Sequence, residues 1–296
     1  MQARLCQQHN QRRETINKPR LNGEKERQAM KVISVINLKG GVGKTFTSYN
    51  MAYELGKRGY KVLVLDNDKQ GNISKAFGCY NPAGECETAK ALTGKYTNPL
   101  HGIIKEHPQT NNVDLIPANM SLMQAVSDLY TAAGNQIDGY KKLINRPIGN
   151  FDLPFPETIS SYYDYMIIDN PPDIAFNVAA ALKITDEVIV PVKIDEWALE
   201  GLDIIADQIE EAKAINPDIK LLGALVTMYR NNDTNIAGLE WLEKKSPVKM
   251  LAKIRYTDKA AESTFFNKPV YEYSPRSGAA QDYKHFITEY LREAGK

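Results

Sequence analysis

The 296-residue sequence has only three cysteines, Cys6, Cys79 and Cys86, and their spacing fits neither a disulfide framework nor a CxxC metal site. It has no run of eighteen apolar residues, which excludes a helix that crosses a membrane. The first thirty residues contain no apolar segment followed by small residues, so we expect no secretory signal. Together these absences indicate a protein of the reducing cytoplasm.

The sequence also has almost no net charge, because 37 Lys and Arg residues oppose 36 Asp and Glu residues to leave +1. That balance argues against a protein that coats nucleic acid over its whole surface. The charge is unevenly distributed, however. Residues 1–30 hold seven basic and three acidic residues, residues 31–240 hold 19 and 26, and residues 241–296 hold 11 and 7. The overall balance therefore does not exclude local basic patches, at the two ends of the sequence, that bind nucleic acid.

The first thirty residues contain few apolar side chains and no hydrophobic period, which predicts a flexible basic arm over 1–30. The arm is too short and too poor in apolar residues for a helix-turn-helix domain. The rest of the chain has no internal repeat and no low-complexity linker. With 43% hydrophobic and 25% charged residues overall, the composition is that of a globular protein, and we predict one domain over 31–296.

Short β-branched runs alternate with helical patterns through this domain. The runs show little polar alternation, as expected for strands that are buried on both faces of a parallel sheet. We expect strands at 31–37, 61–66, 113–116, 165–169, 187–192 and 221–227, and helices at 44–58 and 198–215. This order predicts an α/β fold with a doubly wound, mostly parallel sheet flanked by helices, in which ligands bind at the carboxyl ends of the strands.

A glycine-rich segment, Lys39-Gly40-Gly41-Val42-Gly43-Lys44-Thr45, joins the first expected strand to the helix that follows. Glycines allow backbone N–H groups and the helix N-terminus to surround an anion. In such a loop Lys44 reaches the β- and γ-phosphates, and the Thr45 hydroxyl holds Mg²⁺. The usual loop has glycine where this chain has Leu38, and a lysine follows at once. The segment therefore predicts a nucleotide-phosphate site of an unusual kind.

Carboxylates end two of the expected strands. Asp66 and Asp68 close the second strand, beside the phosphate loop in a doubly wound sheet, and Asp169 ends the run that begins at Tyr165. Carboxylates there can hold Mg²⁺ or orient an attacking water, which are the main tasks of the protein in phosphoryl transfer. The alternative is that Asp66 and Asp68 are turn-forming residues of the kind common at strand ends.

The sequence K-G-G-V-G-K-T after a short strand resembles the deviant Walker A motif of the ParA/MinD group of P-loop ATPases. Three further segments resemble ParA proteins in particular, and they are residues 62–78, 163–173 and 253–283. Residues 187–202 also follow the ParA pattern, so the match runs in order through essentially all of 31–296. The sequence that begins at Met30 resembles the N-terminal sequence of many family members. The alternative to a functional basic arm is therefore that residues 1–29 are a dispensable extension.

The resemblance implies an ATPase that uses ATP and Mg²⁺ to segregate a plasmid, a chromosome or another mobile element. It gives Lys39, Lys44 and Asp68 catalytic roles, with Asp68 positioning water, and it puts Mg²⁺ at Thr45, Asp66 and Asp169. It also implies that Lys39 reaches the phosphates of a partner subunit in an ATP-dependent homodimer, although a loop lysine can equally be just solvated. Further implied are binding of the dimer to non-specific DNA, a ParB-type centromere-binding partner that stimulates hydrolysis, no membrane attachment, and nucleoid association in a prokaryotic cytoplasm.

Three departures from the family pattern bear on the rate of hydrolysis. Phe46 stands where ParA proteins usually have Thr or Ser, Lys69 replaces a Pro, and Asn170 replaces a small residue. For the adenine base of the nucleotide we expect contacts from Met228 and Arg230, although core packing is the more usual role of a Met. The expected nucleotide contacts are Lys39, Gly40, Gly41, Val42, Gly43, Lys44, Thr45, Phe46, Met228 and Arg230.

Lysines gather near the C-terminal end of the sequence, where they could form a patch that binds DNA phosphates. The alternative is an ordinary solvated surface of mixed charge. The expected DNA contacts are Lys244, Lys245, Lys249, Lys253, Lys259, Lys268, Arg276 and Lys284.

Two rival functions stay open. A MinD-like membrane-cycling ATPase should end in an amphipathic helix with large apolar residues toward lipid. Here Ala280, Tyr283 and Ile287 form a stripe more typical of core packing. A nucleotide-binding scaffold that does not hydrolyse ATP is the second rival, because Phe46 and Lys69 are unusual. An iron–sulfur carrier is disfavoured, since the cysteines lack the required pairing.

Overall fold

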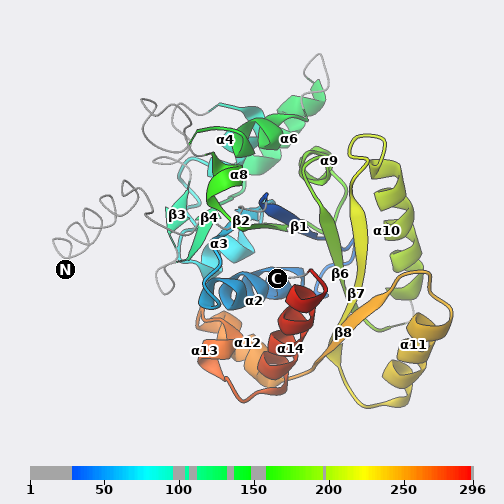
Figure 1. Cartoon of the computed structure of the whole chain (residues 1–296). Helices are drawn as coiled ribbons and strands as arrows, with labels where there is room; N and C mark the ends of the chain where they lie inside the picture. The colour runs from blue at the N-terminus through cyan, green and yellow to red at the C-terminus, as the bar shows by residue number, and fades with distance from the viewer. Residues whose placement is uncertain are drawn as a thin grey trace, which may run out of the picture.

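The computed structural model describes residues 29–95, 104–106, 112–131, 137–147, 158–195 and 198–294. The expected arm therefore lies, except for its last two residues, outside the described part. One sheet of eight strands runs through the molecule in the order β3-β4-β2-β5-β1-β6-β7-β8 (Figure 1). The strands are β1 (Lys31–Val35), β2 (Val62–Asp66), β3 (Lys105–Glu106), β4 (Val113–Ile116), β5 (Tyr165–Asp169), β6 (Glu187–Lys193), β7 (Lys220–Tyr229) and β8 (Met250–Arg255).

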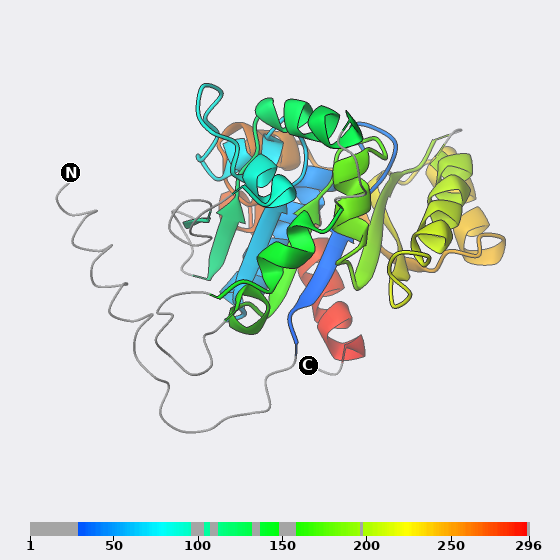
Figure 2. The ribbon, with the colours of Figure 1, turned by 90° about the horizontal axis from the view of Figure 1, so that it is seen from above.

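All the strand pairings are parallel except that of β3, which pairs antiparallel with β4 at one edge. The prediction of a doubly wound, mostly parallel sheet is confirmed. Helices cover both faces (Figures 1 and 2). They are α2 (Lys44–Lys57), α3 (Asn72–Ala76), α4 (Glu87–Thr93), α6 (Ser121–Thr131), α7 (Gly139–Ile144), α8 (Ile159–Tyr162), α9 (Phe176–Leu182), α10 (Ala198–Ala212), α11 (Asp233–Lys244), α12 (Asp258–Phe265), α13 (Val270–Tyr273) and α14 (Gly278–Glu293).

The central strands are apolar throughout because each side chain faces one of two cores. In β2, Val62 and Val64 pack with α2 and α14, whereas Leu63 and Leu65 pack with α4, α6 and α7. A third core lies between α10 and the β6–β7 half of the sheet. Burial on both faces explains why these strands read as continuous apolar runs rather than alternating ones.

The register of three strands places the candidate site. Asp66 of β2 is paired with Asp169 of β5, and Asp169 is paired with Val35 of β1. The carboxyl ends of β1, β2 and β5 therefore reach the same level of the sheet. The expectation that Asp66 and Asp68 lie directly beside the phosphate loop needs one correction, because β5 lies between β2 and β1.

Some expected boundaries were wrong. The first strand ends at Val35 instead of residue 37, the strand expected at 221–227 extends over Lys220–Tyr229, and the helix expected to reach residue 215 ends at Ala212. Two strands, β3 and β8, were not expected. β8 is an edge strand with exposed Lys253 and Arg255, so it lacks the continuous apolar run of a central strand. Among the described helices, none combines the length and the apolar character needed to cross a membrane.

Candidate functional site

The loop between β1 and α2 has the backbone conformation that its glycines permit. Gly41 and Gly43 have φ of 72° and 88°, which L side chains rarely adopt. A Cβ added at Gly40 or Gly41 would meet nothing within 4 Å, so the space over these residues is open. Thr227, at the carboxyl end of β7, supports the loop by donating a hydrogen bond from Oγ1 to the carbonyl oxygen of Val42 at 2.8 Å. The result is an open cradle of backbone at a helix N-terminus, which suits a phosphate group.

Lys44 points inward from this loop. Its side chain is 7% exposed, and Nζ donates to the carbonyl oxygen of Lys39 at 2.9 Å. Burial lowers the pKa of Lys44, while the charges of Asp169, Asp68 and Asp173 act in the opposite direction. A cation that has lost part of its hydration and has only one hydrogen-bond acceptor from the loop is prepared to bind a polyphosphate.

Asp66 and Asp169 are two buried carboxyls on paired strands. Asp66 is fully engaged, since it accepts hydrogen bonds from Asp68 N at 3.1 Å and from Ser74 N and Oγ at 3.0 and 2.5 Å. Asp169 accepts from Ser48 Oγ at 3.0 Å through Oδ1, whereas its buried Oδ2 has no hydrogen-bond partner. A buried carboxylate oxygen without a partner is costly unless a cation or water completes it.

The donor set around Asp169 fits Mg²⁺. No three Asp, Glu, His or Cys side chains of the described residues converge on a ready-made metal site. Mg²⁺ does not need one, because it keeps several waters and is usually held by one or two carboxylates together with substrate phosphates. Asp169 offers its free oxygen, and Thr45, whose hydroxyl lowers the pKa of Asp169, is its neighbour. Asp66 already accepts three hydrogen bonds, so its predicted part in metal binding would be a supporting one.

Burial also changes the protonation of this pair. It raises the pKa of Asp66 to about 8 and that of Asp169 to about 7, and in Asp66 the charge of Asp169 adds to the shift. In the unfolded chain both groups titrate near their ordinary value of about 4. Between these values the folded, metal-free protein holds protons that the unfolded chain releases, so its stability falls as the pH rises.

We therefore expect the metal-free protein to lose stability between pH 5 and pH 7, by about 1.4 kcal/mol per pH unit for each carboxyl still protonated in the folded state. Urea unfolding in EDTA at pH 5, 6 and 7 measures this slope. Asp66→Asn removes one of the two titrating groups. The slope of unfolding free energy against pH should therefore be smaller by the contribution of Asp66. Equal slopes in the two proteins would contradict the prediction.

Asp68 lies on the turn after β2 and is 7% exposed. One of its oxygens, Oδ1, accepts a hydrogen bond from Gln70 N at 2.9 Å, and its charge acts on the buried Lys44. Asp68, Lys44 and Asp169 are thus brought together from three separate strand ends, as the sequence predicted. Their roles in chemistry stay predictions.

The side chain of Lys39 is bound by a residue outside the phosphate loop. Its side chain is 41% exposed, and Nζ forms an ion pair with Asp195, which follows β6. The backbone N of Lys39 donates to Asn37 Oδ1 at 2.8 Å, and Asn37 in turn donates to the carbonyl oxygen of Pro191 at 2.8 Å. Asp195 and Asn37 were not singled out in the sequence. Nothing local marks Asp195, which lies 156 residues from Lys39.

The remaining expected nucleotide contacts take different positions. Phe46 packs against Tyr283 of α14, with ring centroids 5.8 Å apart, so only its backbone is left for a ligand. Met228 is half-buried and has an unusual φ of 52° for a residue other than glycine. The guanidinium of Arg230 lies over the ring of Tyr256 at 3.6 Å. Packing at Tyr283 accounts for the aromatic residue where the family has Thr or Ser.

The lysines expected to bind DNA are exposed or half-exposed, and half of the set is ion-paired. Lys244 pairs with Glu240, Lys249 with Glu293, Lys259 with Glu262 and Lys268 with Glu272. These residues are also spread over several elements, since α11 and α12 lie on opposite sides of β8 and α14 (Figure 1). A single dense patch is therefore not formed within one copy of the described chain.

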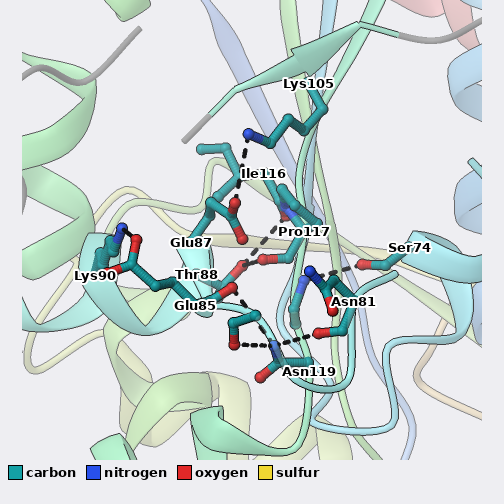
Figure 3. A network of polar contacts seen from close by, with 12 residues as sticks. Ser74, Asn81, Glu85, Glu87, Thr88, Lys90, Lys105, Ile116, Pro117 and Asn119 are labelled. Carbon is teal, nitrogen blue, oxygen red and sulfur yellow. Dashed lines mark hydrogen bonds and ion pairs between the residues drawn. The ribbon is translucent and has the colours of Figure 1, made fainter. Parts of the chain in front are cut away.

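A polar network that the sequence did not reveal joins Ser74, which donates to Asp66, to Asn119 and the loop at 81–84 (Figure 3 shows the part from Ser74 onward). Ser74 Oγ, which donates to Asp66, also accepts from Ala118 N at 2.9 Å. The next residue, Asn119, is 2% exposed and donates from Nδ2 to the carbonyl oxygens of Asn81 and Gly84 at 2.8 and 3.1 Å. The turn after β4 and the loop at 81–84 are thereby tied to the Asp66 carboxyl.

Comparison with known proteins gives consistent results. The family model AAA_31, described as an AAA domain, matches residues 30–221. The sporulation initiation inhibitor protein Soj of Bacillus subtilis is 30% identical over 262 residues, which cover 88% of this chain and 97% of that protein. The chromosome-partitioning ATPase Soj of Thermus thermophilus is 29% identical over 271 residues, which cover 90% of this chain and 97% of that protein.

Solved structures share the fold. Cobyrinic acid a,c-diamide synthase of Mycobacterium smegmatis, crystallised with ADP and magnesium, has a TM-score of 0.73 and 26% identity, over 90% of this chain and 97% of that one. A putative plasmid partition protein of Borrelia burgdorferi bound to AMPPNP has a TM-score of 0.71 and 22% identity, over 89% of this chain and 99% of that one. At these levels of identity the second match shows the fold alone.

Proposed function

Because the chain belongs to the ParA family of partition ATPases, we propose that it hydrolyses ATP with Mg²⁺ to drive the segregation of DNA, as an ATP-dependent homodimer that binds DNA without sequence preference. The observation that carries the proposal is the buried ammonium of Lys44, which donates to the loop carbonyl of Lys39 and is acted on by the charge of Asp169, whose Oδ2 has no hydrogen-bond partner in the described part of the chain. That arrangement is suited to a Mg²⁺–nucleotide phosphate and has no evident purpose without one.

Each residue of the site has a definable task in this reaction. Lys44 and the backbone N–H groups of 40–45 bind the phosphates and balance their charge, while Thr45 and Asp169 hold Mg²⁺. Bound Mg²⁺ would neutralise charge that develops on the phosphate oxygens. Asp68, free to accept at a second oxygen, orients the attacking water toward the phosphate. Phosphoryl transfer asks mainly for such positioning and charge balance from the protein.

Lys39 is proposed to act between subunits. In one copy of the chain its side chain is half-exposed and ion-paired with Asp195, so its ammonium takes no part in its own phosphate cradle. An exposed ion pair is weak, typically worth about 0–1 kcal/mol, and a nucleotide phosphate of a second copy would compete well for the ammonium. ATP would then favour the dimer, because the γ-phosphate supplies the charge that attracts the partner's lysine.

DNA binding is proposed to use the basic residues of the C-terminal part. Their ion pairs are exposed, so DNA phosphates can replace the carboxylates at low cost. Because these residues are spread over several elements of one copy, a dimer would offer a larger basic surface than a monomer. A ParB-type centromere-binding protein is the proposed partner that stimulates hydrolysis, and the nucleoid of a prokaryotic cytoplasm is the proposed location.

The structure gives no support to a membrane-cycling function. Helix α14 buries Tyr283, Phe286, Ile287, Tyr290 and Leu291 against the sheet instead of presenting them outward. Tyr290 is further fixed by a hydrogen bond from its hydroxyl to Glu187 Oε2 at 2.7 Å. The scaffold alternative loses part of its basis, because the packing of Phe46 explains that departure without a loss of function.

The proposed function predicts that the wild-type protein dimerises and binds random-sequence duplex DNA with ATP but not with ADP. Lys39→Ala should bind ATP with unchanged affinity yet fail to dimerise and fail to bind DNA. Asp195→Asn is the matched variant, since it frees the lysine from its ion pair, and it should dimerise at least as well as the wild type. Light scattering and fluorescence anisotropy of labelled DNA measure both properties at two salt concentrations.

An ATP-dependent dimer of normal affinity in Lys39→Ala would exclude the role given to this lysine. DNA affinity that does not fall between 50 and 200 mM salt would exclude the proposed phosphate contacts, because each contact releases counterions and should weaken with salt. Absence of ATP turnover in the wild type, with DNA and a ParB-type partner present, would exclude the proposed function itself.

A further inference from the structure

Four polar side chains form a buried cluster behind Asp68 and Asp169, where β2 and β5 end. Asn67 follows β2, Asn170 follows β5, Asn177 lies in the first turn of α9, and Tyr140 lies in α7. Their exposed fractions are 0%, 1%, 3% and 0%. We call these four residues the amide cluster. None of them was assigned a function above, and they come from four separate segments of the chain.

Asn67 is the centre of the amide cluster. Its Nδ2 donates to Asn170 Oδ1 at 2.8 Å and to the carbonyl oxygen of Asn177 at 3.1 Å. Its Oδ1 accepts from the hydroxyl of Tyr140 at 2.7 Å, and its carbonyl oxygen accepts from Asn177 Nδ2 at 2.7 Å. The side chain of Asn67 therefore points into the protein and is fully used there.

The amide cluster joins the ends of the three strands that form the site. Asn67 N donates to the carbonyl oxygen of Asp169 at 2.9 Å, which ties β2 to β5. Asn170 Nδ2 donates at 3.3 Å to the carbonyl oxygen of Val35, the last residue of β1 before the phosphate loop. Asn67 stands between Asp66 and Asp68, and Asn170 follows Asp169. Any shift of the amide cluster would consequently move the candidate catalytic carboxylates.

Apolar side chains could fill the same space, and burying amides has a cost that their hydrogen bonds only roughly offset. Hydrogen bonds differ from apolar contacts in being directional, so they fix the relative position of the segments that they join. Position matters greatly in catalysis, since a displacement of about 1 Å can reduce the rate by about 100-fold.

We propose that the amide cluster positions Asp68 and Asp169, at the ends of β2 and β5, against the phosphate loop, with Asn67 and Asn170 as positioning residues for hydrolysis. The inference rests on the proposed function, because it concerns the reaction at the same site. It also gives a role to Asn170, which stands where the family usually has a small residue that could not reach both Asn67 and Val35.

The test separates positioning from stability. Asn67→Leu alone leaves Asn170 Oδ1 and the Tyr140 hydroxyl without their partner and should lower the melting temperature. The triple variant Asn67→Leu/Asn170→Ala/Tyr140→Phe removes the partners as well, and such joint replacement by apolar groups can be nearly neutral for stability. In the triple variant we expect recovery of the melting temperature, a kcat that stays at least about tenfold low, and a KM for ATP that is little changed.

Hydrogen exchange gives a readout that does not depend on turnover. The amides of Asn67 and Asp68 are donors to Asp169 and Asp66, and they should exchange faster in the nucleotide-free triple variant than in the wild type. The matched control is Thr185→Val with Ser34→Ala, which removes a buried hydrogen bond of 2.8 Å just before β6. This control should lower the melting temperature while leaving kcat and the KM for ATP unchanged. Tyr140→Phe, the mildest variant, keeps the test available if Asn67→Leu does not fold.

Recovery of kcat together with stability in the triple variant would overturn the proposal and leave the amide cluster a purely structural element. Unchanged hydrogen exchange at Asn67 and Asp68 would overturn it as well. If the wild type itself shows no turnover, the proposed function fails, and the exchange data alone then decide whether the amide cluster holds the ends of β2 and β5.

Discussion

Asp68→Ala should reduce ATP turnover by at least about 100-fold while leaving ATP binding intact. The reason is the division of tasks within the site. Lys44, the backbone of the loop, Thr45 and Asp169 are the groups that would hold the nucleotide and Mg²⁺, and none of them is removed. The carboxylate of Asp68 is the group proposed to orient water, so its loss should slow hydrolysis after ATP has bound. The variant should therefore accumulate as an ATP-bound dimer.

Two matched variants define what the result means. Asp68→Asn keeps an oxygen that can accept from Gln70 N but loses the negative charge, so it separates the shape of the turn from the chemistry. Asp164→Ala removes a carboxylate that likewise accepts a backbone hydrogen bond, from Lys61 N at 2.7 Å, but at the other end of the strands. Turnover measured by phosphate release should fall in both Asp68 variants and stay normal in Asp164→Ala. Wild-type turnover in Asp68→Ala would refute the role given to this residue.

Those parts of the site that depend on local sequence could be predicted. The phosphate loop is a continuous segment whose glycines and Lys44 have defined tasks, and the structure gives it the expected strand, turn and helix. The carboxylates at 66, 68 and 169 could also be placed, because parallel strands deliver their carboxyl ends to one edge of the sheet. Strand order was harder. That β5 separates β2 from β1 follows from long-range pairing, which no local pattern reveals.

The polar side chains that support the site could not be predicted for a related reason. An Asn in a sequence is equally a turn residue, a helix cap or an exposed side chain. Asn67 becomes a buried centre only because Tyr140 and Asn177, 73 and 110 residues away, fold against it. The ion pair of Lys39 with Asp195 could not be predicted for the same reason, because the two residues are far apart in the sequence. Phe46 appeared to be a departure in the nucleotide site, and only the position of Tyr283 shows that its ring belongs to the core.

Lys44→Met should reduce the affinity for ATP by at least about 100-fold, because it removes the buried cation that faces the phosphates. The same change should leave the nucleotide-free protein about as stable as before. Burial lowers the pKa of Lys44, and this desolvation outweighs the attraction of Asp169, Asp68 and Asp173. Burying an apolar side chain of similar length carries no free-energy cost of removing a charge from water, so the Met side chain should be tolerated in the same space.

These two expectations can be measured together by thermal unfolding with and without Mg²⁺-ATP. A ligand present at 100 times its dissociation constant stabilises the folded state by about 2.7 kcal/mol, so the wild type should show a clear rise in melting temperature. In Lys44→Met that rise should disappear at the same ATP concentration, while the melting temperature without ligand stays close to that of the wild type. Lys57→Met changes an exposed lysine at the end of the same helix and should keep the full rise. A Lys44→Met protein that is still stabilised by ATP would show that the loop binds phosphate without its buried cation, and the assignment of Lys44 would then be wrong.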